Sequence, residues 1–143
     1  MDLVASLDAP CPPAELFAWV DDLARYPQWL SIVTRADRDG DGGWMVDLRG
    51  RVGPLARSKR LRMARTTLEP DRLAVFERAE RDGRHHSPWV LRAEVTPAGD
   101  RSHLEMGLHY GGSLWGAVIE RLLRDEIDAS RARLLELVSG RTR

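Results

Sequence analysis

The stretch SLWGAVIERLLRDEIDASRARLLELVS, residues 113–139, decides how the rest of this chain is arranged. Gly111 and Gly112 precede it, and Gly140 follows it. Ser113 is a good N-cap because its hydroxyl accepts a hydrogen bond from a free backbone N–H of the first turn. Glycine suits the left-handed residue that ends many helices. The spacing therefore predicts one long helix over residues 113–139.

This expected helix has an apolar side and a charged side. At 100° per residue, one side carries Trp115, Ile119, Leu122, Leu123, Leu134 and Leu137. The opposite side carries Glu120, Arg121, Arg124, Asp128 and Arg131. A helix of this kind covers the apolar face of another element.

Two polar residues interrupt the apolar side of the helix. Glu126 lies between Ile119 and Leu122 on the helical wheel, and Ser130 lies beside Leu123. A buried carboxylate is costly unless it is paired or protonated. One interpretation is that both residues line a cavity and orient a ligand's polar group. The alternative is that Glu126 lies at the cavity mouth, where it contacts water or pairs with an arginine.

The chain before this helix alternates between apolar and polar residues, which predicts strands. The strand candidates are residues 3–7, 32–36, 44–49, 57–68, 73–80, 87–96 and 102–110. Two short helices are expected after the first strand, over residues 14–20 and from Asp21 through Ala24, with Pro27 interrupting the second. One apolar and one charged face indicate a sheet covered on one side only. The prediction is a single α+β domain over residues 1–143, with about seven antiparallel strands curved around the long helix.

Composition sets limits on function and location. The 22 basic and 22 acidic residues cancel, so nothing in the overall charge attracts nucleic acid or an acidic membrane. Cys11 is the only cysteine, which excludes an intrachain disulfide and fits a reducing cytoplasm. The first residues contain Asp2 and no apolar run, and no uncharged stretch is long enough for a membrane span. We therefore expect a cytoplasmic protein that binds no nucleic acid and has no integral membrane association.

A basic run crosses the middle of the chain and contains Arg49, Arg51, Arg57, Lys59, Arg60, Arg62 and Arg65. A nucleic-acid site would interleave aromatic residues and belong to a basic domain, and neither condition holds. The run is interpreted as a solvated outer strand face that pairs with Glu80, Glu94 or Glu105. The attraction of an anionic ligand or partner remains an alternative.

The residue types that bind metals and cofactors show no suitable pattern. His85 and His86 are adjacent, so on a strand they point to opposite faces. His103 and His109 share the expected outer face, but they lie too far apart for convincing zinc chelation. No nucleophile elbow, phosphate-binding loop or dinucleotide fingerprint occurs, so neither metal nor cofactor is expected. Cys11 is interpreted as structural.

For some candidate residues, the orientation depends on which alternate side chains of the strand face inward. If Val75 faces inward, so does Glu77, and if Met63 faces inward, so does Arg65. Glu77 and Arg65 would then form an ion pair in a cavity wall, although a bulge would turn either side chain outward.

The tryptophans suggest packing and wall positions. Trp19 and Trp29 are expected to pack the short helices against the sheet. Trp44, Trp89 and Trp115 are assigned to the core or to the wall of a cavity for a flat apolar ligand.

The block PAELFAWVDDLARYPQWL, residues 13–30, resembles the opening of SRPBCC proteins. These include START-like domains, the polyketide cyclase/dehydrase family and birch-pollen-allergen-like proteins. The later segment LHYGG, residues 108–112, followed by Trp115-Gly116 and an amphipathic helix, is similar to their ending. The resemblance implies a helix-grip fold with a cavity between the sheet and the C-terminal helix. Its members bind lipids, sterols, quinones or polyketides, and some catalyse cyclisation or dehydration.

The leading hypothesis is therefore binding of a hydrophobic small molecule, of lipid, quinone or polyketide type, with no cofactor. The expected ligand-binding residues are Leu48, Met63, Arg65, Val75, Glu77, Trp89, Leu91, Met106, Leu108, Tyr110, Ile119, Leu122, Leu123, Glu126 and Ser130. One alternative is a polyketide cyclase, aromatase or dehydratase in which Glu126, Glu77 or Tyr110 serves as acid or base. Another is a ligand-free protein-interaction module. The oligomeric state stays open.

Overall fold

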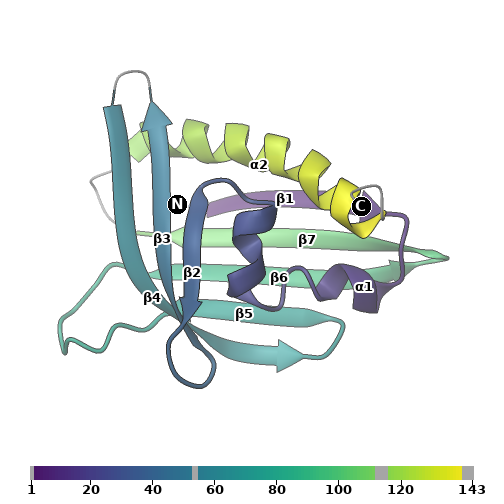
Figure 1. Ribbon diagram of the computed structural model, residues 1–143, viewed down its shortest axis with the longest axis horizontal. Coiled ribbons are helices and arrows are strands. Elements are labelled where there is room, and N and C mark those ends of the chain that lie inside the picture. The colour runs from purple at the N-terminus through teal and green to yellow at the C-terminus, as the bar shows by residue number, and fades with distance from the viewer. Residues whose placement is uncertain (1, 53–54, 112–115, 140–143) are drawn as a thin grey trace.

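The computed structural model describes residues 2–52, 55–111 and 116–139, which form a strongly curved sheet crossed by a long helix (Figure 1). The elements are β1 (Asp2–Ala9), α1 (Pro13–Phe17), the 3-10 helix η1 (Leu23–Gln28), β2 (Val33–Arg38), β3 (Gly43–Val52), β4 (Leu55–Glu69), β5 (Leu73–Arg78), β6 (Trp89–Ala98), β7 (Arg101–Tyr110) and α2 (Gly116–Val138). The expected order of one strand, two short helices, six strands and a long helix is confirmed, as is the helix-grip fold.

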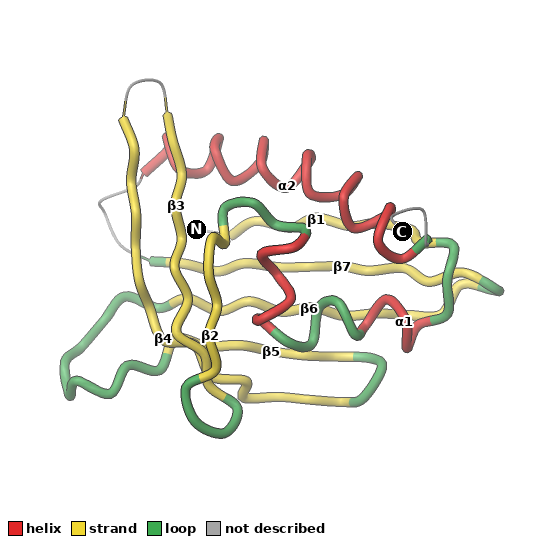
Figure 2. Tube along the Cα trace, viewed as in Figure 1, coloured by secondary structure: helices red, strands yellow, loops and turns green. Residues whose placement is uncertain are grey.

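The strands form one antiparallel sheet in the order β1-β7-β6-β5-β4-β3-β2. The first strand of the chain therefore pairs with the last, and β1 and β2 are the two edges. Figures 1 and 2 show β2, β3 and β4 turning steeply away from the direction of β5, β6 and β7, while α2 runs along the concave side. Because of this bend, α2 and the sheet do not meet in a flat contact, and a cavity lies between them.

Helix α2 follows the predicted amphipathic pattern where the structure describes its side chains. Leu134 is 1% exposed and Val138 is 5% exposed, so the end of the helix is anchored in the core. Arg124 and Asp128 are exposed, as expected for the charged side. The predicted N-cap Ser113, Trp115 and Gly140 lie outside the described residues.

The two short helices differ from the prediction. Helix α1 ends at Phe17 instead of continuing through residue 20, and η1 is a 3-10 helix capped by Asp22, whose carboxylate accepts a hydrogen bond from the Ala24 backbone N–H at 2.9 Å. The expected interruption at Pro27 is wrong, because η1 includes this proline. The backbone N–H groups of Trp29 and Leu30 both bind the carbonyl of Tyr26, which carries the turn past the residue that lacks an N–H.

The basic run does not behave as one solvated face. Arg62 is 7% exposed, and its guanidinium donates to the Asp39 carboxylate at 2.9 Å and to the backbone carbonyls of Asp39 and Ala79, each at 3.0 Å. It lies directly beside Gly43, where a Cβ would overlap it. Arg62 therefore joins the β2–β3 turn to the segment after β5. The prediction of a uniformly solvated run is wrong at this position, because the turn and this segment close over the strand.

Candidate functional site

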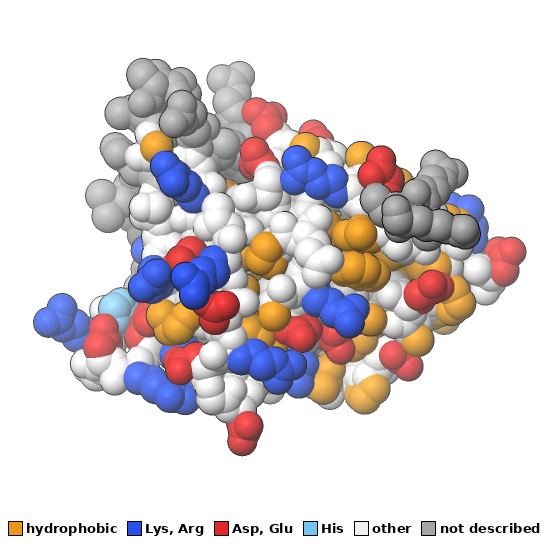
Figure 3. Space-filling model, in the orientation of Figure 1, with side chains coloured by type: hydrophobic (Ala, Val, Ile, Leu, Met, Phe, Trp, Pro, Cys, Tyr) orange, Lys and Arg blue, Asp and Glu red, His pale blue; other side chains and the backbone are white. Residues whose placement is uncertain are grey.

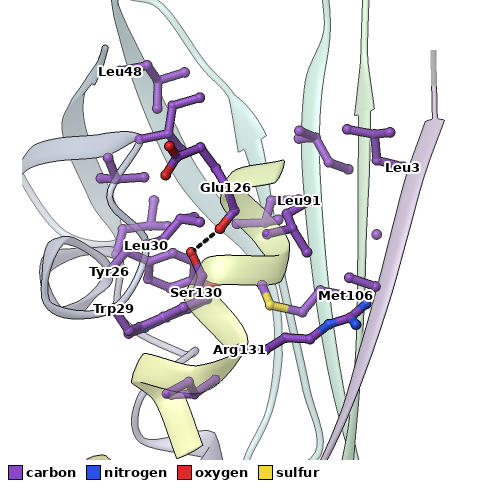
Figure 4. A pocket seen from close by; sticks show the side chains of 18 of the residues that line it. Leu3, Tyr26, Trp29, Leu30, Leu48, Leu91, Met106, Glu126, Ser130 and Arg131 are labelled. Carbon is purple, nitrogen blue, oxygen red and sulfur yellow. Dashed lines mark hydrogen bonds between the residues drawn. The ribbon is translucent and has the colours of Figure 1, made fainter. Parts of the chain in front are cut away.

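A cavity of about 140 Å³ lies between the concave face of the sheet and α2. Figure 4 shows side chains entering it from β1, η1, β3, β6, β7 and α2. Its wall is almost entirely carbon, and its polar side chains lie mainly on α2, with Glu126, Ser130 and Arg131. A space of this kind suits an apolar molecule, since little in the wall replaces the hydrogen bonds that a polar one makes with water.

Eight of the expected ligand-binding residues contribute to this wall: Leu48, Met63, Trp89, Leu91, Met106, Leu108, Glu126 and Ser130. Leu91 and Leu108 are cross-strand partners on β6 and β7, so they lie side by side on the concave face. The side chains of Ile119, Leu122 and Leu123 lie outside the described residues.

The predicted inward orientation of Val75 and Glu77 is wrong. The residues of β5 that face the core are Ala74 and Phe76, both 0% exposed. Glu77 is exposed and accepts a hydrogen bond from the Thr66 hydroxyl at 2.5 Å. Because Ala74 pairs with Ala93 and Phe76 with Leu91, the concave face takes the even-numbered residues of this strand.

Arg65 is on the concave face, as expected, but it does not line the cavity or pair with Glu77. It lies across the sheet from Phe76, and its guanidinium is 5.8 Å from the centre of the Trp44 ring. It donates to the backbone carbonyl of Asp21 at 2.8 Å. Arg65 therefore ties the segment before η1 to the sheet.

Tyr110 is buried but is not part of the cavity wall. Its ring packs against that of its cross-strand partner Trp89, a wall residue, with 5.3 Å between the ring centres. The geometry supports Tyr110 as a packing partner of a wall residue.

Glu126 and Ser130 are brought together at the cavity by one turn of α2. The Ser130 hydroxyl donates to the Glu126 backbone carbonyl at 2.6 Å, so its polar atom is satisfied inside the helix (Figure 4). The Glu126 carboxylate accepts a hydrogen bond from the hydroxyl of Ser31, in the loop before β2. The arginine partner considered from the sequence is not observed among the described residues, and Arg131 instead pairs with Asp128 at 3.5 Å.

Sequence reasoning missed the contribution of η1 to the cavity. Tyr26, Trp29 and Leu30 form part of the wall. The Tyr26 hydroxyl donates to the Val20 carbonyl at 2.9 Å, and the Trp29 indole N–H donates to the Trp19 carbonyl at 3.1 Å. Burial raises the pKa of Tyr26, which keeps it neutral. The signal was present in residues 13–30, but a motif does not tell which of its aromatic side chains face a cavity.

Sequence reasoning also missed the inner residues of β1 and the stem of Arg131. Leu3, Ala5 and Leu7 line the cavity because β1 pairs with β7 at the edge of the sheet. Arg131 was assigned to the charged side, yet its aliphatic stem reaches the cavity while its guanidinium pairs with Asp128.

The outer face of the sheet carries histidines, as expected. His103 pairs with Asp8 and His109 with Asp2, both at 2.8 Å, so each links β7 to β1. Within the described ranges, no three His, Cys, Asp or Glu side chains converge as a metal site requires. Cys11 is buried, and its carbonyl accepts a hydrogen bond from Ser102 at 2.6 Å.

The surface mixes charges of both signs. On the face shown in Figure 3, acidic side chains lie among the basic ones. None of the helices in the described part of the chain is both long and apolar enough to cross a membrane.

Several solved structures share this fold across nearly their whole length. They include a START superfamily protein from Mycobacterium smegmatis (16% identity, TM-score 0.71, covering 99% of each chain). They also include the Zhui aromatase/cyclase from Streptomyces sp. R1128 (15%, 0.69, 100% of this chain and 96% of that one). A conserved protein from Geobacillus kaustophilus has 10% identity and a TM-score of 0.76, with 98% and 96% covered. At these identities the likeness establishes the fold alone.

No curated protein sequence matches this chain. A family model does match residues 2–138, which is nearly the whole sequence and includes every element that builds the cavity. The chain belongs to the family described as polyketide cyclase / dehydrase and lipid transport.

Proposed function

We propose that this protein binds a hydrophobic small molecule, of lipid, quinone or polyketide type, in the cavity between the sheet and α2. The observation that carries the proposal is the apolar wall, to which β1, β3, β4, β6, β7, η1 and α2 all contribute. Burial of apolar surface supplies about 25 cal/mol per Å² before the cost of association. The family description, which includes lipid transport, supports the same class of ligand.

The cavity also weighs against the ligand-free interaction module considered from the sequence. That function favours a filled interior and an exposed apolar patch. Val4 and Leu68 are the exposed large apolar side chains in the described ranges, at 67% and 43%, and they lie on different strands, β1 and β4. Isolated apolar residues of this kind are normal on protein surfaces.

N-phenyl-1-naphthylamine, an uncharged apolar fluorophore, tests the proposal directly. We expect its fluorescence to rise on titration with the protein and to reach saturation. Leu108→Trp fills the cavity from β7 and should weaken binding by ~10-fold or more, because the larger side chain occupies space that the ligand needs. Val4→Trp adds the same side chain to the outer face of β1 and should leave binding unchanged. Equal affinity for both variants would overturn the proposed site.

A second candidate, cyclisation or dehydration of a polyketide-like substrate, rests on Glu126. It is the one carboxylate among the described wall residues. Its hydrogen bond from Ser31 fixes one oxygen near the ligand space. Glu77 points away from the cavity and Tyr110 is not a wall residue, so neither retains an acid–base role in this candidate. Glu126→Gln should lower turnover of such a substrate by ~10² or more, whereas a pure carrier shows no turnover to lose.

A further inference from the structure

The wall of the cavity contains a buried hydrogen-bond donor without an acceptor. Trp89 is 8% exposed, and its indole N–H is the only fully buried side-chain polar atom in the described residues that lacks a partner. The two other wall aromatics with polar atoms, Tyr26 and Trp29, donate to backbone carbonyls. An unpaired buried donor costs free energy that an acceptor on a ligand would recover.

Arg78 is a cation on the strand next to Trp89. Met63 pairs with Arg78 across β4 and β5, and the pairing of Glu77 with Val90 sets Arg78 beside Trp89 on the concave face. The Arg78 side chain is 10% exposed, and its Nε donates to Glu80 at 2.8 Å. Its other hydrogen bonds among the described residues are long, at 3.4 Å to the Ser87 carbonyl and 3.5 Å to the Ser87 hydroxyl. The guanidinium therefore has hydrogen-bonding capacity left over.

Lys59 adds a second cation on the same face. It is the direct cross-strand partner of Leu48, a wall residue, so the two side chains project on the same side of the sheet. Burial lowers the pKa of Lys59, the charge of Arg78 lowers it further, and Glu80 opposes this. No ion pair of Lys59 occurs among the described residues. Among the described residues, Glu80 is thus the carboxylate that interacts with both cations, and it also accepts from the backbone N–H of Arg62 at 3.3 Å.

We propose that Lys59, Arg78 and Trp89, the donor cluster, bind an anionic oxygen group, of carboxylate type, on an otherwise apolar ligand. This inference rests on the proposed function, because Trp89 lines the same cavity. Lys59 and Arg78 do not line it, and each lies across the sheet from a wall residue, Leu48 or Met63. The Glu126 carboxylate on α2 is held by the Ser31 hydroxyl and would repel an anionic group. The Glu80 carboxylate is paired with Arg78. The head of the ligand therefore lies against β4, β5 and β6, and its apolar body extends along the wall of the cavity. The donor cluster thereby sets both the class and the orientation of the ligand.

Two fluorophores with a common skeleton separate the contribution of the anion from that of the apolar body. N-phenyl-1-naphthylamine is neutral, and 1-anilinonaphthalene-8-sulfonate adds one anionic sulfonate. Lys59→Met keeps an unbranched apolar side chain and removes the charge, and Trp89→Phe keeps an aromatic ring and removes the N–H. Each should weaken binding of the sulfonate by ~10-fold, the value of a hydrogen bond to a charged group. Lys59→Met should change binding of the neutral probe less than twofold. Trp89→Phe also removes apolar wall surface, so it should weaken binding of both probes, and that of the sulfonate more.

Arg60→Met is the matched control for Lys59→Met. Arg60 is the next residue on β4, points to the outer face and pairs with Asp47 at 2.6 Å, so its loss should leave both probes unaffected. In the wild-type protein, the indole N–H signal of Trp89 should move downfield with the sulfonate and not with the neutral probe.

The outcomes distinguish the two proposals. If neither probe enters the cavity, as shown by equal affinities for Leu108→Trp and Val4→Trp, the proposed function fails. If the neutral probe binds there but the ratio of the two affinities is the same in wild type, Lys59→Met and Trp89→Phe, the anionic subsite is overturned while the apolar cavity stands. A ratio altered equally by Arg60→Met would also overturn it, as it would indicate general surface charge.

Discussion

The Ser31 hydroxyl donates a hydrogen bond to the Glu126 carboxylate, joining the loop before β2 to the middle of α2. Both segments border the cavity. Leu30 and Ile32, on either side of Ser31, line it, and so does Ile127, the residue after Glu126. The hydrogen bond therefore connects the helical side of the cavity to the side formed by η1 and β2.

Loss of this contact should speed ligand exchange. Ser31→Ala removes the donor and leaves the carboxylate to water, so the two segments separate more readily. We expect the dissociation rate of N-phenyl-1-naphthylamine, measured by stopped-flow fluorescence, to rise ~3- to 10-fold. This factor corresponds to only part of the free energy of a charge-assisted hydrogen bond, because the contact is partly buried. Ser139→Ala removes a serine hydroxyl that bonds within α2 and should leave the rate unchanged. An unchanged rate in Ser31→Ala would contradict this role.

Arg62 should stabilise the fold far more than its sequence neighbour. Arg62→Met leaves the carboxylate and carbonyl of Asp39 and the carbonyl of Ala79 without their donor. We expect a loss of about 2–3 kcal/mol in the free energy of unfolding, measured by urea denaturation. Arg60→Met breaks an exposed pair with Asp47 and should not shift the midpoint measurably. Equal effects of the two substitutions would show that burial of Arg62 contributes nothing.

The negative charge of Asp21 should destabilise the protein near neutral pH. Burial raises the pKa of Asp21 above 3.8, with Arg65 opposing the rise. A carboxyl whose pKa is higher in the folded state holds its proton more tightly there, so the free energy of unfolding falls as the pH rises through the interval above 3.8. Asp21→Asn should therefore raise stability at pH 7, and the gain should shrink on acidification and disappear below pH 3.8. Asp41→Asn, at an exposed turn position, is the control; an equal gain at both pH values would contradict the assignment.

Leu134 should be the main anchor of the second half of α2. It is 1% exposed and forms part of the cavity wall. Leu134→Ala should lower the free energy of unfolding by about 2–5 kcal/mol, because it removes buried carbon and enlarges the cavity. Arg133→Ala, on the exposed side of the same turn, should change it by less than about 0.5 kcal/mol. Thermal or urea unfolding of both variants measures the difference, and similar effects would show that α2 is not held through Leu134.

The fold was predictable because several local signals agreed. The amphipathic pattern of residues 113–139 and the alternation around Met106 and Leu108 both indicated a helix against a one-sided sheet, and the structure confirms this. The phase of β5 was not predictable. Leu73, Ala74, Val75 and Phe76 are all apolar, so periodicity does not tell which pair faces inward. Pairing with β6 makes that choice, and it turns Glu77 outward.

The candidate site was predictable only in part, for a related reason. Strand and helix periodicity identified Met106 and Ser130, whose side chains stand on regular elements. Ser31 lies in a loop and Tyr26 in a 3-10 helix, where no period relates sequence position to direction. The unpaired indole N–H of Trp89 could not be predicted either, because it depends on which side chains surround it in the fold. Among the described residues, no acceptor approaches it.

Methyl NMR of the methionines tests the central claim most directly. Met63 and Met106 line the cavity from β4 and β7, whereas Met45 lies on the opposite face of β3, across from Arg62. With methionine methyl groups labelled with carbon-13, titration with N-phenyl-1-naphthylamine should shift the signals of Met63 and Met106 and leave that of Met45 in place. A titration that moves Met45 alone, or that leaves Met63 and Met106 unmoved while the probe binds, would contradict a ligand site between the sheet and α2.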